Sequence, residues 1–210
     1  MMILRSAPAS PFGRMVKLAA HVLGLMDQIT VEHSDTIDPD DTIRLQNPLG
    51  KIPALITDSR VIYDSRVILE YFDHLGGGGT IIPQDPEARM DCLIRNARNI
   101  GIMDAALLVV YEGRYRPDEM RVESFVEHQR DKIRRALDQI ATESIEYTND
   151  DMPDISQIGL ACVLDYLDFR KPINWRDHCP HHVGFMQSFA AAVPGYRVTL
   201  PPGLDPSTLR

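Results

Sequence analysis

The apolar positions of this chain follow two different periods. As far as residue 76 they form short runs of strand length, at residues 3–4, 29–32, 51–55 and 61–63. Between the first two runs lies a helical pattern that Ser10 and Pro11 begin and Gly24 ends, because Ser is a good N-cap, Pro fits the first helical position and Gly favours a stop. A second helix is expected over residues 64–75, after a tight hairpin at residues 58–60.

These elements alternate as strand, helix and strand, and then as strand, strand and helix. A crossover helix between two strands predicts a parallel pair, and the hairpin predicts an antiparallel pair. The order therefore predicts a mixed four-stranded sheet with helices on both faces, in the thioredoxin-like arrangement. We expect this domain to cover residues 1–76.

From residue 86 onward the pattern is helical throughout. Helices are expected over residues 87–115, 119–145, 154–169 and 181–193. The third is the most continuously apolar, which predicts a central helix buried on all sides. Residues 87–210 are therefore expected to form an all-α bundle domain, joined to the first domain by a linker at residues 77–86.

The linker region starts with four successive glycines, at residues 76–79. A glycine run can cradle phosphate, but such loops follow a strand and open a helix. This run follows a helix and leads to Ile81, Ile82 and Pro83. A flexible helix stop and domain linker is therefore the favoured interpretation.

Charge and composition exclude several classes of function. The net charge of −8, with Lys and Arg scattered, argues against nucleic-acid binding. The longest apolar run, residues 105–110, is too short to cross a bilayer, and the first residues lack the apolar core of a signal peptide. Cys92, Cys162 and Cys179 form no Cys-x-x-Cys pair and are typical of reduced thiols. We expect a soluble cytoplasmic protein with no membrane or nucleic-acid partner.

A metal site is considered and disfavoured at residues 177–182, whose sequence is DHCPHH. The possible ligands lie too close together in sequence for the usual spacing of a structural zinc site. A polar loop before the last helix is the favoured interpretation, and no metal is expected.

A proline and a helix start indicate where a peptide could bind. Pro53 removes a backbone donor at a strand entry. If the bond before it is cis, Ile52 turns its backbone N–H and C=O outward, where an extended peptide could pair with them. Asp64 and Ser65 open a helix whose free N–H groups suit a carboxylate. Together these features predict a small, acidic peptide ligand.

Four segments are distinctive in their order and spacing: residues 10–14 (SPFGR), 47–55 (NPLGKIPAL), 64–71 (DSRVILEY) and 153–158 (PDISQI). Together they resemble the cytosolic glutathione S-transferase superfamily, over nearly the full length of the chain. In order, they are similar to the family's serine-type start of the first helix, its cis-proline strand, its carboxylate-binding helix start and its buried helix cap. The resemblance is to serine-type, tau- or theta-like bacterial members.

Two positions depart from the family's pattern. The buried cap usually reads Ser/Thr-x-x-Asp in the family, and here it is Asp154-x-x-Gln157. Because Gln can complete a capping box as Glu does, we expect the fold to survive this change. Asp64 stands where relatives often have Glu, which shortens by one methylene the reach towards an ammonium group.

The resemblance implies a catalytic role for Ser10, whose hydroxyl would donate a hydrogen bond to the sulfur of the co-substrate glutathione. From the residues alone, a helix cap without activity is the favoured interpretation of Ser10, because Ser before Pro is a good N-cap. Ser6, at the end of the first strand, is a competing hydroxyl. These alternatives stay open in the sequence.

The resemblance also implies the residues that bind glutathione. Ile52, beside Pro53, would pair its backbone with the cysteinyl unit, and Lys51 would meet the glycine carboxylate. Without the resemblance, a solvated surface lysine is the favoured interpretation of Lys51. Asp64 would contact the γ-glutamyl ammonium, and Ser65 the γ-glutamyl carboxylate.

The activity that the resemblance implies is conjugation of glutathione thiolate to a small electrophile by a homodimeric enzyme. The implied candidates for the electrophile pocket are Phe12, Met103, Leu107, Tyr111 and Tyr115, with core packing as the alternative. A glutathione-binding or protein-interaction member without significant transferase activity is the alternative function. A thiol–disulfide oxidoreductase is disfavoured, because no cysteine occurs before Cys92.

Overall fold

Four short strands form one mixed sheet in this computed structural model, which describes residues 1–148 and 152–205. The strands are β1 (Met2–Ser6), β2 (Ile29–His33), β3 (Ala54–Ile56) and β4 (Val61–Ile62), in the spatial order β2-β1-β3-β4. β1 pairs parallel with β2 and antiparallel with β3, and β3 pairs antiparallel with β4. The predicted mixed, thioredoxin-like sheet is confirmed.

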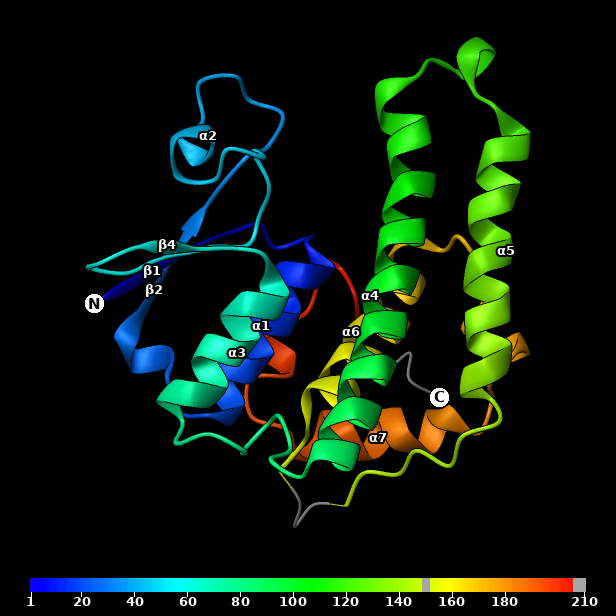
Figure 1. The fold of residues 1–210 in the computed structure, drawn as a ribbon. Helices are drawn as coiled ribbons and strands as arrows, with labels where there is room; N and C mark the ends of the chain where they lie inside the picture. Colours follow the sequence, from blue (N-terminus) through cyan, green and yellow to red (C-terminus); the bar gives the residue numbers. More distant parts are fainter. Residues whose placement is uncertain (149–151, 206–210) are drawn as a thin grey trace.

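Three helices cover the faces of this sheet (Figure 1). The crossover helix α1 (Pro11–Val22) and α3 (Ser65–Leu75) lie together on one face, and the short α2 (Ile43–Gln46) lies on the other. Arg5 on β1 ties α2 to the sheet, because its guanidinium contacts Asp41 at 3.0 Å and donates to Gln46 at 2.8 Å. Both faces of the sheet are therefore covered, as the sequence predicts.

The remaining described chain is helical, as predicted. Its helices are α4 (Pro86–Tyr115), α5 (Glu123–Ile140), α6 (Ile155–Arg170) and α7 (His182–Ala192). Short 3-10 turns lie at Met26–Gln28, Asp118–Met120, Trp175–Asp177 and Arg197–Thr199. α6 is buried along almost its whole length and packs against α1 and α4, which confirms the predicted central helix. None of the described helices is long and apolar enough to cross a membrane.

The helix α5 is shorter at both ends than the predicted range of residues 119–145. At its start, the Glu112 carboxylate of α4 accepts the backbone N–H of Val122 at 2.8 Å, which fixes Val122 as the residue before the helix. Beyond its end, Glu143 pairs with both guanidinium nitrogens of Arg98 on α4. Side-chain contacts between helices, rather than local propensity, therefore set these two boundaries.

The glycine run ends α3 as predicted, but the segment after it is firmly held rather than flexible. Gly77, Gly78 and Gly79 all have positive φ, a conformation that suits glycine. The carboxylate of Asp73, buried at the end of α3, accepts the backbone N–H groups of Gly79, Thr80, Ile81 and Ile82. One side chain thus fixes the connection between the two domains.

A buried ion pair joins the two domains in their common core. Arg14 on α1 contacts Asp165 on α6 at 2.6 Å, and both side chains are 1% exposed. The hydroxyl of Tyr196 donates to the other carboxylate oxygen at 3.0 Å, and the Arg14 guanidinium lies 4.9 Å from the centre of the Tyr196 ring. Burial alone lowers the pKa of Arg14, but the Asp165 carboxylate raises it, so Arg14 stays charged. Burial raises the pKa of Asp165, and the positive charge of Arg14 opposes this rise.

Candidate functional site

Three predicted segments meet at one edge of the sheet. β1 ends at this edge, and the loop that follows leads to Ser10. Because β3 runs antiparallel to β1, its preceding residues, Ile52 and Pro53, lie at the same edge. β4 runs antiparallel to β3, so Asp64 and Ser65 follow it at that edge as well. Strand topology alone therefore brings the predicted binding residues together.

Ser10 is the N-cap of α1 and is half-buried. Its Oγ accepts the backbone N–H of Gly13 at 3.1 Å, and Pro11 occupies the first helical position. A serine hydroxyl has one donor hydrogen in addition to its acceptor lone pairs. Since the cap uses the oxygen as an acceptor, the hydrogen of Ser10 is free to donate.

Ser6 is placed differently from Ser10. It is 2% exposed, and its Oγ is buried without a hydrogen-bond partner among the described residues. A Cβ added to Gly13 would lie 2.2 Å from this Oγ, so a glycine is needed where α1 approaches the end of β1. The close approach covers Ser6 and leaves Ser10 as the more accessible hydroxyl.

The loop before β3 is built by a buried asparagine, which the sequence analysis did not single out. The amide of Asn47 donates to the carbonyl of Lys51 at 2.8 Å, and its side-chain oxygen accepts the N–H of Leu49 at 3.1 Å. Gly50 takes a positive φ of 60° to complete the turn. The Asn-Pro-x-Gly pattern of residues 47–50 is a turn signal that could have revealed this role.

The peptide bond between Ile52 and Pro53 is cis, as the resemblance implies. Pro53 is buried, whereas Ile52 is half-buried. In the part of the chain that the structure describes, neither the N–H nor the C=O of Ile52 forms a hydrogen bond within the protein. Both groups are therefore available to pair with an extended peptide.

The start of α3 offers a second polar group at the same edge. Asp64 is the exposed N-cap, and its Oδ1 accepts the backbone N–H of Arg66 at 3.0 Å. Ser65 is the first helical residue and is buried. Its backbone N–H has no intrahelical acceptor, because the first N–H groups of a helix never do.

A carboxylate from the second domain also acts on this edge. Asp104 on α4 lies within electrostatic range of Lys51, Asp64 and Arg66. Partial burial raises the pKa of Asp104, while the positive charges of Arg66 and Lys51 act to lower it. Sequence reasoning missed Asp104, because a single Asp on a long helix gives no signal of what it faces.

The predicted electrophile-pocket residues do not share one environment. Phe12, Leu107 and Tyr111 are half-buried, and Tyr115 is exposed. Met103 differs, because it is fully buried in the core between the helices and is not available to a ligand in this structure. We therefore omit Met103 from the candidate pocket.

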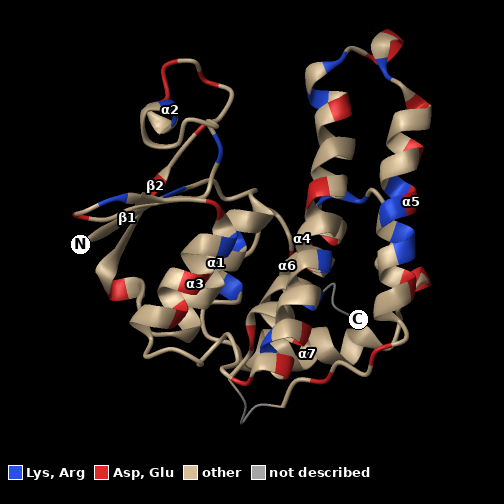
Figure 2. Ribbon diagram, viewed as in Figure 1, with Lys and Arg blue, Asp and Glu red and all other residues tan. Residues whose placement is uncertain are grey.

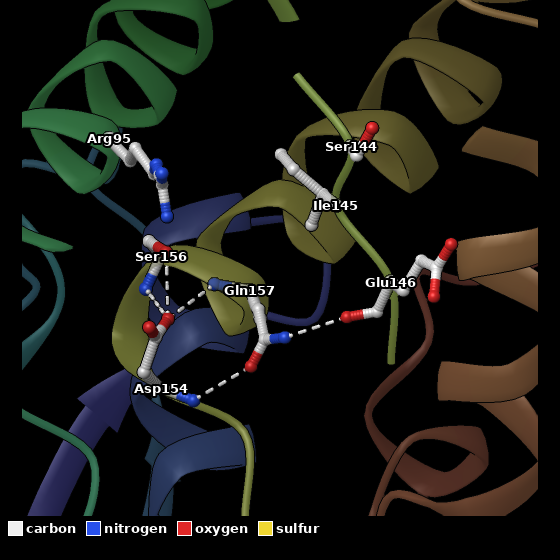
Figure 3. A pocket seen from close by; sticks show the side chains of 7 residues that line it. All are labelled: Arg95, Ser144, Ile145, Glu146, Asp154, Ser156 and Gln157. Carbon is white, nitrogen blue, oxygen red and sulfur yellow. Dashed lines mark hydrogen bonds between the residues drawn. The ribbon is translucent and has the colours of Figure 1, made fainter. Parts of the chain in front are cut away.

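Two hollows in the described surface contain none of the predicted site residues. The first, of about 110 Å³, lies at the start of α6 (Figure 3). There Asp154 accepts the N–H groups of Ser156 and Gln157, and Gln157 accepts the N–H of Asp154. This confirms the predicted capping box, in which these polar groups form hydrogen bonds with one another. The second hollow lies near His21 and Tyr196.

The other candidate chemistry in the sequence finds no support. Cys92, Cys162 and Cys179 are buried and free. Burial raises the pKa of the first two thiols to about 12 and that of the third to about 11, so all three are protonated at neutral pH. Within residues 1–148 and 152–205, no group of three or more His, Cys, Asp or Glu could hold a metal ion.

The family model of the glutathione S-transferase N-terminal domain matches residues 4–79. The "Uncharacterized GST-like protein YibF" of Escherichia coli (strain K12) is 32% identical over 184 residues, which cover 85% of this chain and 89% of that protein. This chain belongs to the glutathione S-transferase family. It has the family's glutathione-binding fold, and the more specific tau- or theta-like assignment stays a prediction.

Solved glutathione transferases share this structure closely. A glutathione transferase family member from Pseudomonas fluorescens Pf-5, with bound glutathione, is 40% identical, with a TM-score of 0.89 over 96% of this chain and 100% of that one. A structure from the same organism, with bound S-(propanoic acid)-glutathione, is 38% identical, with a TM-score of 0.83 over 98% of this chain and 100% of that one. Glutathione is thus the ligand that solved relatives bind.

Proposed function

We propose that this protein is a glutathione transferase that binds glutathione at the sheet edge and stabilises its thiolate for attack on an electrophile. The observation that carries this proposal is the Ser10 hydroxyl. Its oxygen accepts from Gly13 at the start of α1, and its hydrogen is free to donate to a sulfur atom.

The energetic demand on Ser10 is modest. A free thiol has a pKa of about 8.5, and lowering it by about two units needs about 2.7 kcal/mol. A hydrogen bond to a charged group supplies about 1.5–3 kcal/mol. The helix N-terminus adds about 0.3–1 kcal/mol. Ser10 and the start of α1 are therefore sufficient, and no general base is required.

The other groups at the edge suit the rest of the tripeptide. The free N–H and C=O of Ile52 would pair with the cysteinyl backbone, as in strand addition. The start of α3 at Ser65 would hold the γ-glutamyl carboxylate, and the second oxygen of Asp64 would meet the ammonium group. Lys51 would face the glycine carboxylate.

We also propose that the protein acts as a homodimer, which is typical of the family. Val67 on α3 and Met90 and Ile94 on α4 are at least half-exposed apolar side chains near the junction of the two domains. A symmetric partner would cover them. The three free cysteines support a cytoplasmic location, where thiols stay reduced.

The proposed role of Ser10 is tested with Ser10→Ala, using Ser6→Ala as the matched control. We expect Ser10→Ala to bind glutathione but to raise the pKa of the bound thiol by roughly one to two units, the worth of one charge-assisted hydrogen bond. Ultraviolet titration of the thiolate measures this shift. Conjugation of an aryl halide at neutral pH should fall roughly tenfold to a hundredfold.

Ser6→Ala should change neither quantity, because the Ser6 hydroxyl is enclosed. If Ser10→Ala leaves the thiol pKa and the rate unchanged, Ser10 is only a helix cap. If the unmodified protein binds glutathione but reacts with no aryl halide, epoxide, isothiocyanate or peroxide, the result supports the alternative, a glutathione-binding protein without transferase activity.

A further inference from the structure

Two arginines at the ends of neighbouring helices have no carboxylate partner. Arg114 is near the end of α4, and Arg170 is the last residue of α6. Neither forms a salt bridge with any described residue. Many other arginines of this acidic chain do, including Arg14, Arg98 and Arg134. The two free guanidinium groups therefore leave positive charge uncompensated at one place.

Each of the two guanidinium groups lies close to at least one aromatic ring. Arg114 lies 5.4 Å from the ring centre of Tyr111, and Arg170 lies 4.2 Å from that of Phe169 and 5.9 Å from that of Tyr166. The charges of Arg114 and Arg170 both act on the Tyr166 hydroxyl, as does Tyr111, so these side chains form one group. We call Tyr111, Arg114, Tyr166, Phe169 and Arg170 the arginine–aromatic cluster.

One buried hydrogen-bond donor of the cluster lacks an acceptor. Nε of Arg170 is buried and has no hydrogen-bond partner in the described structure, whereas the Tyr166 hydroxyl has the Arg170 side chain as its hydrogen-bond neighbour. Buried polar groups in native proteins are nearly always paired, and an unpaired donor is costly. An unpaired guanidinium donor, in a cluster whose two guanidinium groups lack a carboxylate partner, favours an acceptor that carries negative charge.

The cluster lies at the same end of the molecule as Ser10. α1 and α6 run in opposite directions, and Arg14 meets Asp165 where they cross (Figure 1). Ser10 is about one turn before Arg14, and Phe169 is about one turn after Asp165, so both lie towards the same end. A molecule seated on the cluster would therefore lie on the Ser10 side of the domain junction.

We propose that the arginine–aromatic cluster is a subsite for the carboxylate of an electrophile with a planar, apolar body. The proposal rests on the proposed transferase function and names its substrate class. Guanidinium groups bind carboxylates with two parallel hydrogen bonds, and the rings of Tyr111 and Phe169 offer faces for a planar body. The negative carboxylate of the bound molecule and the positive guanidinium groups of the cluster neutralise each other.

A matched pair of aryl chlorides tests this inference: 4-chloro-3-nitrobenzoate, which is anionic, and 4-chloro-3-nitrobenzamide, which is neutral. In both, the glutathione sulfur forms a bond to the ring carbon, the carbon–chlorine bond breaks, and chloride leaves with the bonding pair. The thiol proton passes to solvent when the thiol ionises. The two reactions differ only in the group opposite the chlorine.

We expect a lower KM for the benzoate than for the benzamide. Arg114→Gln with Arg170→Gln should raise the KM for the benzoate roughly tenfold to a hundredfold, the usual worth of charge-assisted hydrogen bonds, and leave the benzamide and glutathione KM values unchanged. Arg114→Lys with Arg170→Lys should restore part of the preference. Arg135→Gln, which removes an exposed charge on α5, is the matched control and should change nothing.

Binding without glutathione separates this inference from the proposed function. We expect 4-nitrobenzoate to bind more tightly than 4-nitrobenzamide in calorimetric titration, with the preference lost in the double Gln variant. If no aryl chloride is conjugated but this preference is found, the transferase proposal fails and the subsite stands. If the two compounds bind alike, or the variants weaken both equally, the subsite is overturned even where conjugation proceeds.

Discussion

The two halves of this protein hold their polar groups in different ways. At the proposed glutathione-binding edge the contacts are local: Ser10 is held by Gly13, and Asp64 by Arg66, within three residues along the chain. In the helical domain several contacts are distant, as between Asn99 and Ser156, which are 57 positions apart, and the pair of Arg14 and Asp165, 151 positions apart, joins this domain to the first.

The difference separates binding from stability. The local contacts at the edge are half-exposed, so water can replace a lost partner and the cost to folding is small. The distant contacts are buried, so a lost partner leaves a polar group or a charge unpaired in the core, which is expensive. Substitutions at the edge should therefore change ligand affinity first, and substitutions in the helical domain should change stability first.

The largest expected effect comes from breaking the ion pair that joins the two domains. Arg14→Met leaves the Asp165 carboxylate buried, with the Tyr196 hydroxyl as its remaining hydrogen-bond partner among the described residues. We expect the free energy of unfolding to fall by about 3–5 kcal/mol, because an uncompensated charge stays in the core. Urea denaturation followed by circular dichroism measures this loss.

The double variant Arg14→Met with Asp165→Leu is the control, since it removes both charges. It should recover most of the loss, because replacing a buried pair with apolar groups of similar volume is often nearly neutral. Equal stability of the single and double variants would contradict the importance of charge pairing at this junction.

Local signals in the sequence were enough to predict most of the fold and to bring the predicted binding residues to one edge of the sheet. Ser10 with Pro11, and Asp64 before an apolar helix, are start signals that depend only on neighbouring residues, and both helices begin there. The order of strands and helices then fixes which segments share an edge. The apolar stretch at α6 likewise predicted its central place.

Features that depend on distant partners could not be predicted. The early end of α5 follows from the ion pair between Glu143 and Arg98. The fixed conformation of the linker follows from the hydrogen bonds that the buried Asp73 carboxylate accepts from its backbone. Met103 lies in the core. Its position along α4 fits either a core residue or a pocket residue, so the sequence could not decide between them. In each case the decisive partner belongs to another element, and no local pattern encodes that pairing.

A buried histidine in the helical domain should make stability depend on pH. His182 is 1% exposed, and neither ring nitrogen has a hydrogen-bond partner in the described structure. Burial, helped by His181 and Arg98 and opposed by Glu143, lowers the pKa of His182 to about 4. The unfolded value is about 6.5, so the unfolded chain binds more protons between these limits and stability falls as the pH drops from 6.5 to 4.

We expect His182 to contribute up to about 3 kcal/mol of this acid loss, from the difference between the two pKa values. His182→Phe keeps a ring of similar size and removes the titrating group, so its stability should vary less over this range. Denaturant titrations at several pH values measure the difference. His128→Gln, which removes an exposed histidine on α5, is the control. An acid loss that is the same in His182→Phe and the unmodified protein would contradict the role of His182.

The smallest expected effect compares two aspartate caps, one from each half. Asp154 accepts two backbone N–H groups in a capping box, at 2.8 and 2.9 Å, whereas the exposed Asp64 accepts one. Asp154→Ala should cost about 1–2 kcal/mol of stability and leave glutathione affinity unchanged. Asp64→Ala with Ser65→Ala should cost less than about 1 kcal/mol but weaken glutathione binding by roughly tenfold or more, because the γ-glutamyl group loses its partners. Thermal denaturation measures the stability of both variants, and titration calorimetry measures their affinity for glutathione. If Asp154→Ala loses as much affinity as the Asp64 and Ser65 variant, binding and stability are not divided between the two halves.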